Sequence, residues 1–118
     1  MNERDENILL NIKDEVEILL EMTEGYDLQS FLSDEKTKRA VSMSLIKIGE
    51  SVKSLSNDLK QMYPAVRWSS ITGLRDIAAH NYDGLRMEDI WEIVTKDVSE
   101  LLEQVKDILY ADEKCREK

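Results

Sequence analysis

The sequence has few of the residues that interrupt a helix. It contains one Pro and four Gly among 118 residues, and a sandwich of short strands needs more turn residues than that. Hydrophobic residues make up 42% and charged residues 35% of the chain, a balance typical of helices with one buried stripe and solvated outer faces. The sequence therefore predicts an all-α protein, and its length predicts a single domain.

The sequence also lacks a long apolar run. No uninterrupted stretch approaches the ~20 apolar residues that a membrane-spanning helix needs. The start, MNERDENILLNIK, has neither the basic flank nor the apolar centre of a signal peptide. We expect a cytoplasmic protein that makes no contact with a membrane.

Cysteine and histidine are nearly absent. The single cysteine, Cys115, lies in the charged tail ADEKCREK with no Cys or His at metal-ligand spacing. The single histidine, His80, leaves the many carboxylates without the histidine cluster that a hydrolytic metal site would use. We expect an exposed thiol, no internal disulfide, no metal and no cofactor.

Positive charge is scarce as well. The formal net charge is -9, and nonspecific affinity for nucleic acid comes from clustered Lys and Arg. A general nucleic-acid coat is therefore excluded, and any contact with nucleic acid must be local.

Three stretches of the chain repeat apolar residues at alternating steps of three and four, the period of an amphipathic helix. They predict helices from about residue 4 to 24, from an N-cap at Ser33 to Pro64, and from Arg86 to about 110, with a charged tail over 111–118. The stripes are Leu9, Ile12, Val16, Leu19 and Thr23; Val41, Leu45, Ile48, Val52, Leu55, Leu59 and Met62; and Met87, Trp91, Val94, Val98, Leu101, Val105 and Ile108.

A shorter helix is expected in WSSITGLRDIAAHNYDG, with Ser69 or Ser70 as its cap and Asn81 or Gly84 at its end. Its buried side would carry Ile71, Leu74 and Ala78. Short connections favour antiparallel neighbours. The prediction is an antiparallel bundle of four to five helices in a single domain over residues 1–110.

The short helix carries the residues best suited to chemistry, Arg75 and His80. Arginine presents a fixed positive fork that suits phosphate oxygens, and histidine can move a proton near neutral pH. The pair suits metal-free attack of an RNA 2'-hydroxyl on the adjacent phosphate, with His80 moving the proton and Arg75 stabilising the charge on the phosphate oxygens. DNA would be inert to this mechanism.

One histidine is too few for a reaction that gains from both a base and an acid, so we expect a homodimer that supplies two. Geometry points the same way, because five residues at ~100° each leave Arg75 and His80 ~140° apart around an ideal helix. Either the helix ends before His80, or a facing copy of the chain completes the site.

The stretch from Ile46 to Val94 resembles the HepT-like branch of the HEPN superfamily, all-helical proteins that include toxin ribonucleases of prokaryotic toxin-antitoxin pairs. The flanking helices fit the bundle of that family. The matching pieces are Ile48-Gly49-Glu50, Tyr63-Pro64, Trp68, Ile71, Gly73-Leu74-Arg75, His80, Tyr82 and the helix of Trp91.

The resemblance implies that Arg75 and His80 form the Arg-x4-His ribonuclease motif of that family, and that Tyr82 extends it to Arg-x4-His-x-Tyr. It further implies a homodimer with both motifs in one cleft. In toxins with the extended motif, a minimal nucleotidyltransferase antitoxin, as in type VII pairs, adenylylates the tyrosine. Asp76 stands where this branch more often has asparagine, and it can either hold Arg75 or His80 in place or weaken the affinity for phosphate.

Other interpretations stay open at this point. A non-catalytic HEPN-like module could bind a nucleotidyltransferase or nucleotide and cleave nothing, and the overall acidity and Asp76 favour it. A purely structural helical adaptor would leave Arg75 and His80 without a shared cleft. Tyr82 could be a packing aromatic, and Glu50, Tyr63 and Trp68 are expected to support the fold.

Overall fold

The computed structural model describes residues 1–81 and 87–116, and for residues 80, 81 and 116 it describes the helical backbone. Every regular element in these ranges is helical, which confirms the all-α prediction. The elements are α1 (Glu3–Thr23), α2 (Leu28–Ser33), α3 (Glu35–Lys53), α4 (Asn57–Met62), α5 (Trp68–Thr72), α6 (Leu74–Asn81), α7 (Met87–Glu92), the π-helix η1 (Ile93–Asp97) and α8 (Val98–Arg116).

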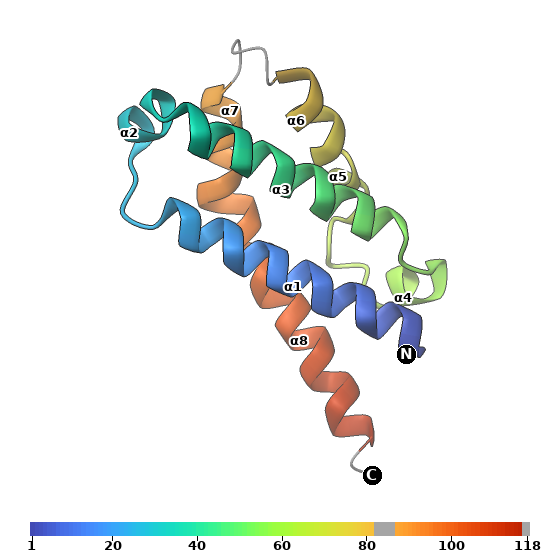
Figure 1. The fold of residues 1–118 in the computed structure, drawn as a ribbon. Helices are drawn as coiled ribbons and strands as arrows, with labels where there is room; N and C mark the ends of the chain where they lie inside the picture. The colour runs from blue at the N-terminus through green and yellow to red at the C-terminus, as the bar shows by residue number, and fades with distance from the viewer. Residues whose placement is uncertain (82–86, 117–118) are drawn as a thin grey trace.

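The long helices form an elongated bundle of 50 × 26 × 20 Å. α1 and α3 lie side by side and antiparallel, and α8 runs behind α1 (Figure 1). α5 and α6 pack against the side of α3 (Figure 1). The segment predicted as one short helix, which forms α5 and α6, therefore packs mainly on α3.

Helix α1 agrees with its sequence pattern. Asn2 caps its start by accepting a hydrogen bond from the Asp5 backbone N–H at 2.6 Å. Gly25, with φ of +80°, follows its end, where a side chain would be strained. All five residues of the predicted stripe are buried, namely Leu9, Ile12, Val16, Leu19 and Thr23.

The N-cap of α3 lies one residue after the predicted position, and a further helix precedes it. The segment between the first two predicted helices forms α2, which buries Phe31 completely. The N-cap of α3 is Asp34 rather than Ser33, and it accepts a hydrogen bond from the Thr37 backbone N–H. A hydrogen bond from the Tyr26 hydroxyl, followed by those from Thr37, lowers the pKa of Asp34 from 3.8 to about 2.

The predicted helix from 33 to 64 is broken in two, between Lys53 and Asn57. Ser56 caps α4 and donates its backbone N–H and hydroxyl to the carboxylate of Asp5, at 3.0 and 2.5 Å. Asp5 is 2% exposed, and a buried carboxylate needs such donors. The predicted core position Met62 was wrong, because this side chain is 66% exposed.

The shorter predicted helix is also divided, at Gly73, into α5 and α6. Neither Ser69 nor Ser70 caps it, because α5 has no side-chain cap. Leu74 and Ala78 are buried as expected. The helical backbone continues to Asn81, whereas Gly84 lies outside the described residues.

The last predicted helix forms as one run of α7, η1 and α8. Its middle is a π-helix, in which the Val98 N–H reaches the Ile93 carbonyl, five residues back. The predicted stripe packs in or against the core throughout, and α8 continues to Arg116, past the expected end near 110. In the described part of the chain, no helix is long and apolar enough to cross a membrane.

Candidate functional site

The candidate site is built on α6, which holds Arg75 at the surface of the bundle. Leu74 and Ala78 point into the core and fix the rotation of this helix. That rotation leaves the Arg75 side chain 51% exposed, next to the exposed side chain of Asp76. Arg75 is therefore both anchored through its backbone and open to a ligand.

Gly49 lets α6 approach α3 closely at the residue that carries the guanidinium. A Cβ atom on Gly49 would lie 3.0 Å from the Arg75 backbone nitrogen, 3.1 Å from the Arg75 Cβ and 3.1 Å from the Thr72 carbonyl oxygen. Such distances are tighter than ordinary contacts of a Cβ atom, so a side chain here would push α6 away by a few tenths of an ångström. Gly49 therefore permits the present close approach of Arg75 to α3.

Gly49→Ala is expected to lower the free energy of unfolding by about 1 kcal/mol, measured by chemical denaturation. Overpacking costs ~1–3 kcal/mol, and Ala regains ~1 kcal/mol of helix propensity over Gly. The matched variant is Gly73→Ala, whose Cβ would meet only the Ser70 and Ser69 carbonyl oxygens, at 3.3 and 3.6 Å, and which should cost less. A Gly49→Ala protein as stable as the wild type would show that α6 can shift at no cost.

Two carboxylates hold the guanidinium of Arg75. Glu50, on α3, pairs with its Nε, and Asp76 accepts a hydrogen bond from Nη1 at 3.2 Å. All three side chains are about half exposed or more, so water and salt screen these pairs and each contributes at most ~1 kcal/mol. A phosphate can therefore compete for Arg75, while Glu50 and Asp76 keep it oriented in the meantime.

Arg75 and His80 both lie within α6, so the helix does not end between them. Of the two explanations for their ~140° separation on an ideal helix, the one in which the helix ends before His80 is therefore wrong. The side chain of His80 and the whole of Tyr82 lie outside the described residues. Their proposed roles stay predictions from the sequence.

Two of the three residues expected to support the fold do so. Trp68 is buried and donates its indole Nε1–H to the Tyr63 carbonyl oxygen at 3.0 Å, and Tyr63 packs against the core. Glu50 instead points to Arg75 from the surface of α3. No local spacing relates Glu50 to Arg75, so sequence reasoning missed this contact, and only the pairing of α3 with α6 creates it.

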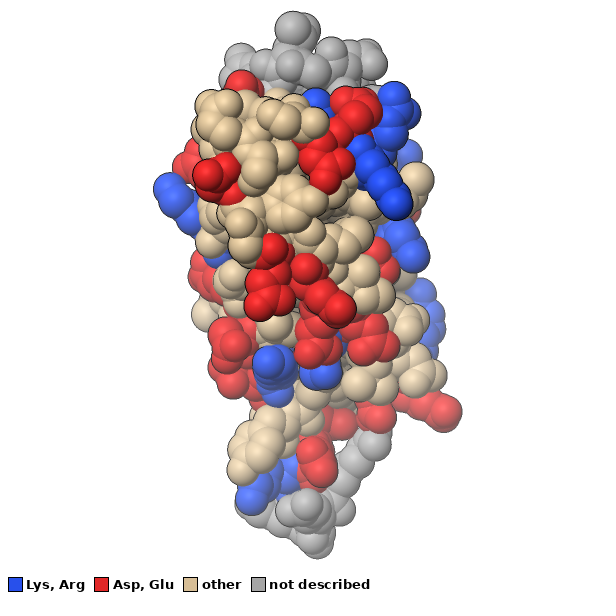
Figure 2. Space-filling model, turned by 60° about the vertical axis from the view of Figure 1, so that its left-hand side comes forward, with Lys and Arg blue, Asp and Glu red and all other residues tan. Residues whose placement is uncertain are grey.

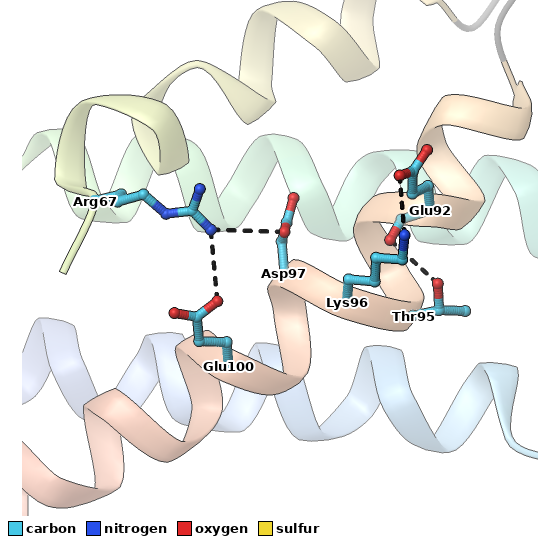
Figure 3. Close-up of polar contacts among 6 residues, drawn as sticks. All are labelled: Arg67, Glu92, Thr95, Lys96, Asp97 and Glu100. Carbon is cyan, nitrogen blue, oxygen red and sulfur yellow. Dashed lines mark hydrogen bonds and ion pairs between the residues drawn. The ribbon is translucent and has the colours of Figure 1, made fainter.

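A second opening lies between α5 and the π-helix, and it does not suit an anionic ligand. It is a cleft of about 60 Å³ whose charged lining consists of Arg67, Asp97 and Glu100. Arg67 already reaches across it to Asp97 at 3.8 Å and Glu100 at 3.5 Å (Figure 3). One arginine and two carboxylates leave a net negative charge, which disfavours phosphate binding in this cleft. The ion pairs of Arg67 instead connect the start of α5 to η1 and α8.

The fold and the site together define an all-α helical bundle with an Arg-x4-His motif on one short surface helix. The family described as ribonuclease HepT-like matches residues 12–108. The chain therefore belongs to the HepT-like ribonuclease family, which confirms the resemblance to the HepT-like branch of the HEPN superfamily.

Curated relatives cover most of the chain. "Putative RNase MJ0127" of Methanocaldococcus jannaschii is 41% identical over 111 residues, which make up 91% of this chain and 88% of the relative. "Putative RNase TTE0752" of Caldanaerobacter subterraneus is 39% identical over 86% of this chain and 90% of the relative. "Probable ribonuclease HepT" of Thermococcus cleftensis is 32% identical over 86% of this chain and 92% of the relative. No solved structure matches the chain.

Proposed function

We propose that this protein is a metal-independent endoribonuclease and the toxin of a type VII toxin-antitoxin pair. The observation that supports this most is the half-exposed guanidinium of Arg75, on the same short helix as His80, in a chain of the HepT-like ribonuclease family. Three relatives whose names describe them as ribonucleases point to the same activity.

In the proposed reaction, the 2'-oxygen of one nucleotide bonds to the adjacent phosphorus while the bond from phosphorus to the 5'-oxygen breaks. One imidazole takes the proton of the 2'-hydroxyl, and an imidazolium gives a proton to the departing 5'-oxygen. Arg75 stabilises the charge that builds on the phosphate oxygens. The products are a 2',3'-cyclic phosphate and a 5'-hydroxyl.

The two proton transfers call for two copies of His80, and therefore for a homodimer. The backbone of α6 runs through Arg75 and His80 without a break, and on an ideal helix their spacing corresponds to ~140°. A second copy of the chain with its motif in the same cleft would bring both residue types to one phosphate. This is the composite site that the proposal assigns to the dimer interface.

The purified protein is expected to cleave single-stranded RNA at the same rate with and without EDTA. The motif offers a proton carrier and a cation, and neither depends on a bound metal. The cleavage products are identified by mass spectrometry, which should find the 2',3'-cyclic phosphate. A matched oligonucleotide of DNA should remain intact because it has no 2'-hydroxyl.

Two results would contradict this mechanism. The first is activity that a chelator abolishes and that one added metal restores. The second is undiminished cleavage by a His80→Ala protein whose thermal unfolding matches the wild type.

Silencing by the antitoxin is proposed to act through Tyr82. The backbone of α6 is helical to Asn81, so Tyr82 follows directly, two residues beyond His80. AMP on its hydroxyl would add a bulky group with a negative phosphodiester beside the catalytic motif. Both the bulk and the like charge would exclude an RNA phosphate.

Co-expression with the partner nucleotidyltransferase is expected to add the mass of one or more AMP groups at Tyr82 and to abolish ribonuclease activity. Tyr82→Phe should keep much of its activity and escape silencing, because it lacks the acceptor oxygen. Intact-mass spectrometry and an RNA cleavage assay measure both effects. Silencing of the Phe variant to the same extent as wild type would show that the antitoxin acts by occlusion.

A second candidate function is a non-catalytic helical partner of a nucleotidyltransferase. The observation that favours it is the pairing of Arg75 with both Glu50 and Asp76, which offsets the positive charge that a phosphate would need. The cleavage assay separates the two candidates, because the non-catalytic partner leaves RNA intact in the presence and absence of EDTA.

A further inference from the structure

Positive charge is concentrated in one part of this acidic chain. Residues 36–75 contain eight of the 16 Lys and Arg residues but only two of the 25 Asp and Glu residues. Their formal charge is +6, so the remainder of the chain carries -15 against the total of -9. In Figure 2 a column of Lys and Arg follows the right-hand edge, while most charged side chains facing the viewer are Asp and Glu.

Most cations of this segment are already neutralised by carboxylates. Lys38 and Arg39 pair with Glu35, and Lys47 pairs with Glu15. Arg67 and Arg75 have the partners described above. Among the described residues, the other three cations of the segment, Lys36, Lys53 and Lys60, form no ion pair, so their charges are available to a ligand.

Lys53 and Lys60 face the same open recess. It holds about 320 Å³ and is lined by Lys53 from α3, Lys60 from α4, and Trp68, Ser69 and Thr72 from α5. The Thr72 hydroxyl already donates to the Trp68 carbonyl oxygen, whereas the exposed Ser69 hydroxyl is free to donate. Two ammonium groups and a hydroxyl are the donors that proteins use for nucleic-acid phosphates.

The recess begins three residues from the pair of Arg75 and Glu50, both along α3 and along the chain from α6 back to α5. On α3, Lys53 follows Glu50 by three residues, a spacing that places side chains ~5–6 Å apart on one helix face. On the other side, Thr72 precedes Arg75 by three residues, and its carbonyl oxygen lies at the same close approach to Gly49. A strand whose phosphate contacts Arg75 would therefore run directly into the recess.

We propose that the recess between α3, α4 and α5 binds a backbone phosphate of the RNA strand next to the one that is cleaved. The inference deepens the proposed function and rests on it for the direction of the strand. Lys53 and Lys60 neutralise the phosphate, and Ser69 donates a hydrogen bond to it. None of these groups reads a base, so the contact is independent of sequence and positions the strand on Arg75.

The test measures binding rather than cleavage, on a full-length His80→Ala background. The probe is a labelled single-stranded RNA of ~12 nucleotides, long enough to span several phosphates, titrated at increasing salt. The variant Lys53→Gln/Lys60→Gln is expected to weaken binding about tenfold at low salt, and to reduce the slope of log K against log salt by about 0.7 for each lost phosphate contact. Thermal unfolding checks that the variant is folded.

Two further variants control for charge and structure. Lys13→Gln/Lys106→Gln removes the same charge from α1 and α8, far from the recess in sequence, and should leave the salt slope unchanged. Lys53→Arg/Lys60→Arg keeps the charge and should restore most of the binding. Equal slopes for the recess variant and the α1 and α8 variant would overturn the proposal.

A free nucleotide carries the same phosphate group, so a second experiment distinguishes a free nucleotide from RNA as the ligand of the recess. AMP and inorganic phosphate are titrated separately into wild type and the recess variant by calorimetry. Micromolar AMP binding that depends on Lys53 and Lys60, with no change in the RNA salt slope, would overturn the RNA assignment. If RNA binding depends on the recess but wild type cleaves no RNA, the proposed function fails and this binding site stands.

Discussion

A dimer with one wild-type subunit and one His80→Ala subunit is expected to cleave RNA far more slowly than half the wild-type rate. In the proposed shared cleft, one imidazole takes the proton of the 2'-hydroxyl and the other gives a proton to the departing 5'-oxygen. Losing either imidazole therefore removes one of the two proton transfers from every turnover. General acid-base catalysis contributes ~10²–10⁴-fold. We therefore expect a loss of at least ~100-fold. Two differently tagged subunits are co-expressed, the mixed dimer is isolated by two affinity steps, and initial rates are measured.

A tagged dimer of two wild-type subunits, isolated in the same way, is the control for the tags and the purification. Half of the wild-type rate in the mixed dimer would mean that each subunit carries an independent site, and would refute the composite cleft. A monomer in light scattering at micromolar concentrations would refute it more directly.

Arg75→Ala is expected to lower kcat by ~10²-fold or more, with a smaller rise in KM. A charge aimed at the phosphate oxygens acts chiefly in the transition state, where negative charge builds up, and loss of one such donor in other enzymes costs ~10²–10³-fold. Steady-state kinetics on a defined RNA oligonucleotide separate the two constants. A rise in KM with unchanged kcat would make Arg75 a residue that only positions the strand.

Arg67→Ala is the matched control. Arg67 is also an exposed arginine held by two carboxylates, Asp97 and Glu100, and it is the N-cap residue of α5, so its loss should leave cleavage near the wild-type rate. The double variant Arg75→Ala/Glu50→Gln tests a second explanation for the lower kcat of Arg75→Ala. If it recovers most of the rate, repulsion between the freed Glu50 and the phosphate, rather than loss of the guanidinium, explains the effect.

Sequence periodicity was sufficient for the first and the last of the long predicted helices and for their buried faces. The stripe of α1 and the stripe from Met87 to Ile108 pack where the spacing predicts, because a helix repeats every 3.6 residues and apolar side chains avoid water. Periodicity did not predict the breaks after Lys53 and at Gly73, since the apolar steps continue through both. Those breaks depend on partners elsewhere in the fold, such as the buried Asp5 that bonds to Ser56.

For the candidate site, the sequence alone determined the motif of Arg75, His80 and Tyr82 and, through it, the family. Only the tertiary structure decided what surrounds Arg75. Glu50 reaches the guanidinium because α6 packs on α3 at Gly49, and Lys53 comes to share a recess with Lys60 because α3, α4 and α5 meet there. Local spacing describes which face of a helix is buried, but it holds no information about which helix covers that face, because that depends on how all the faces fit together at once.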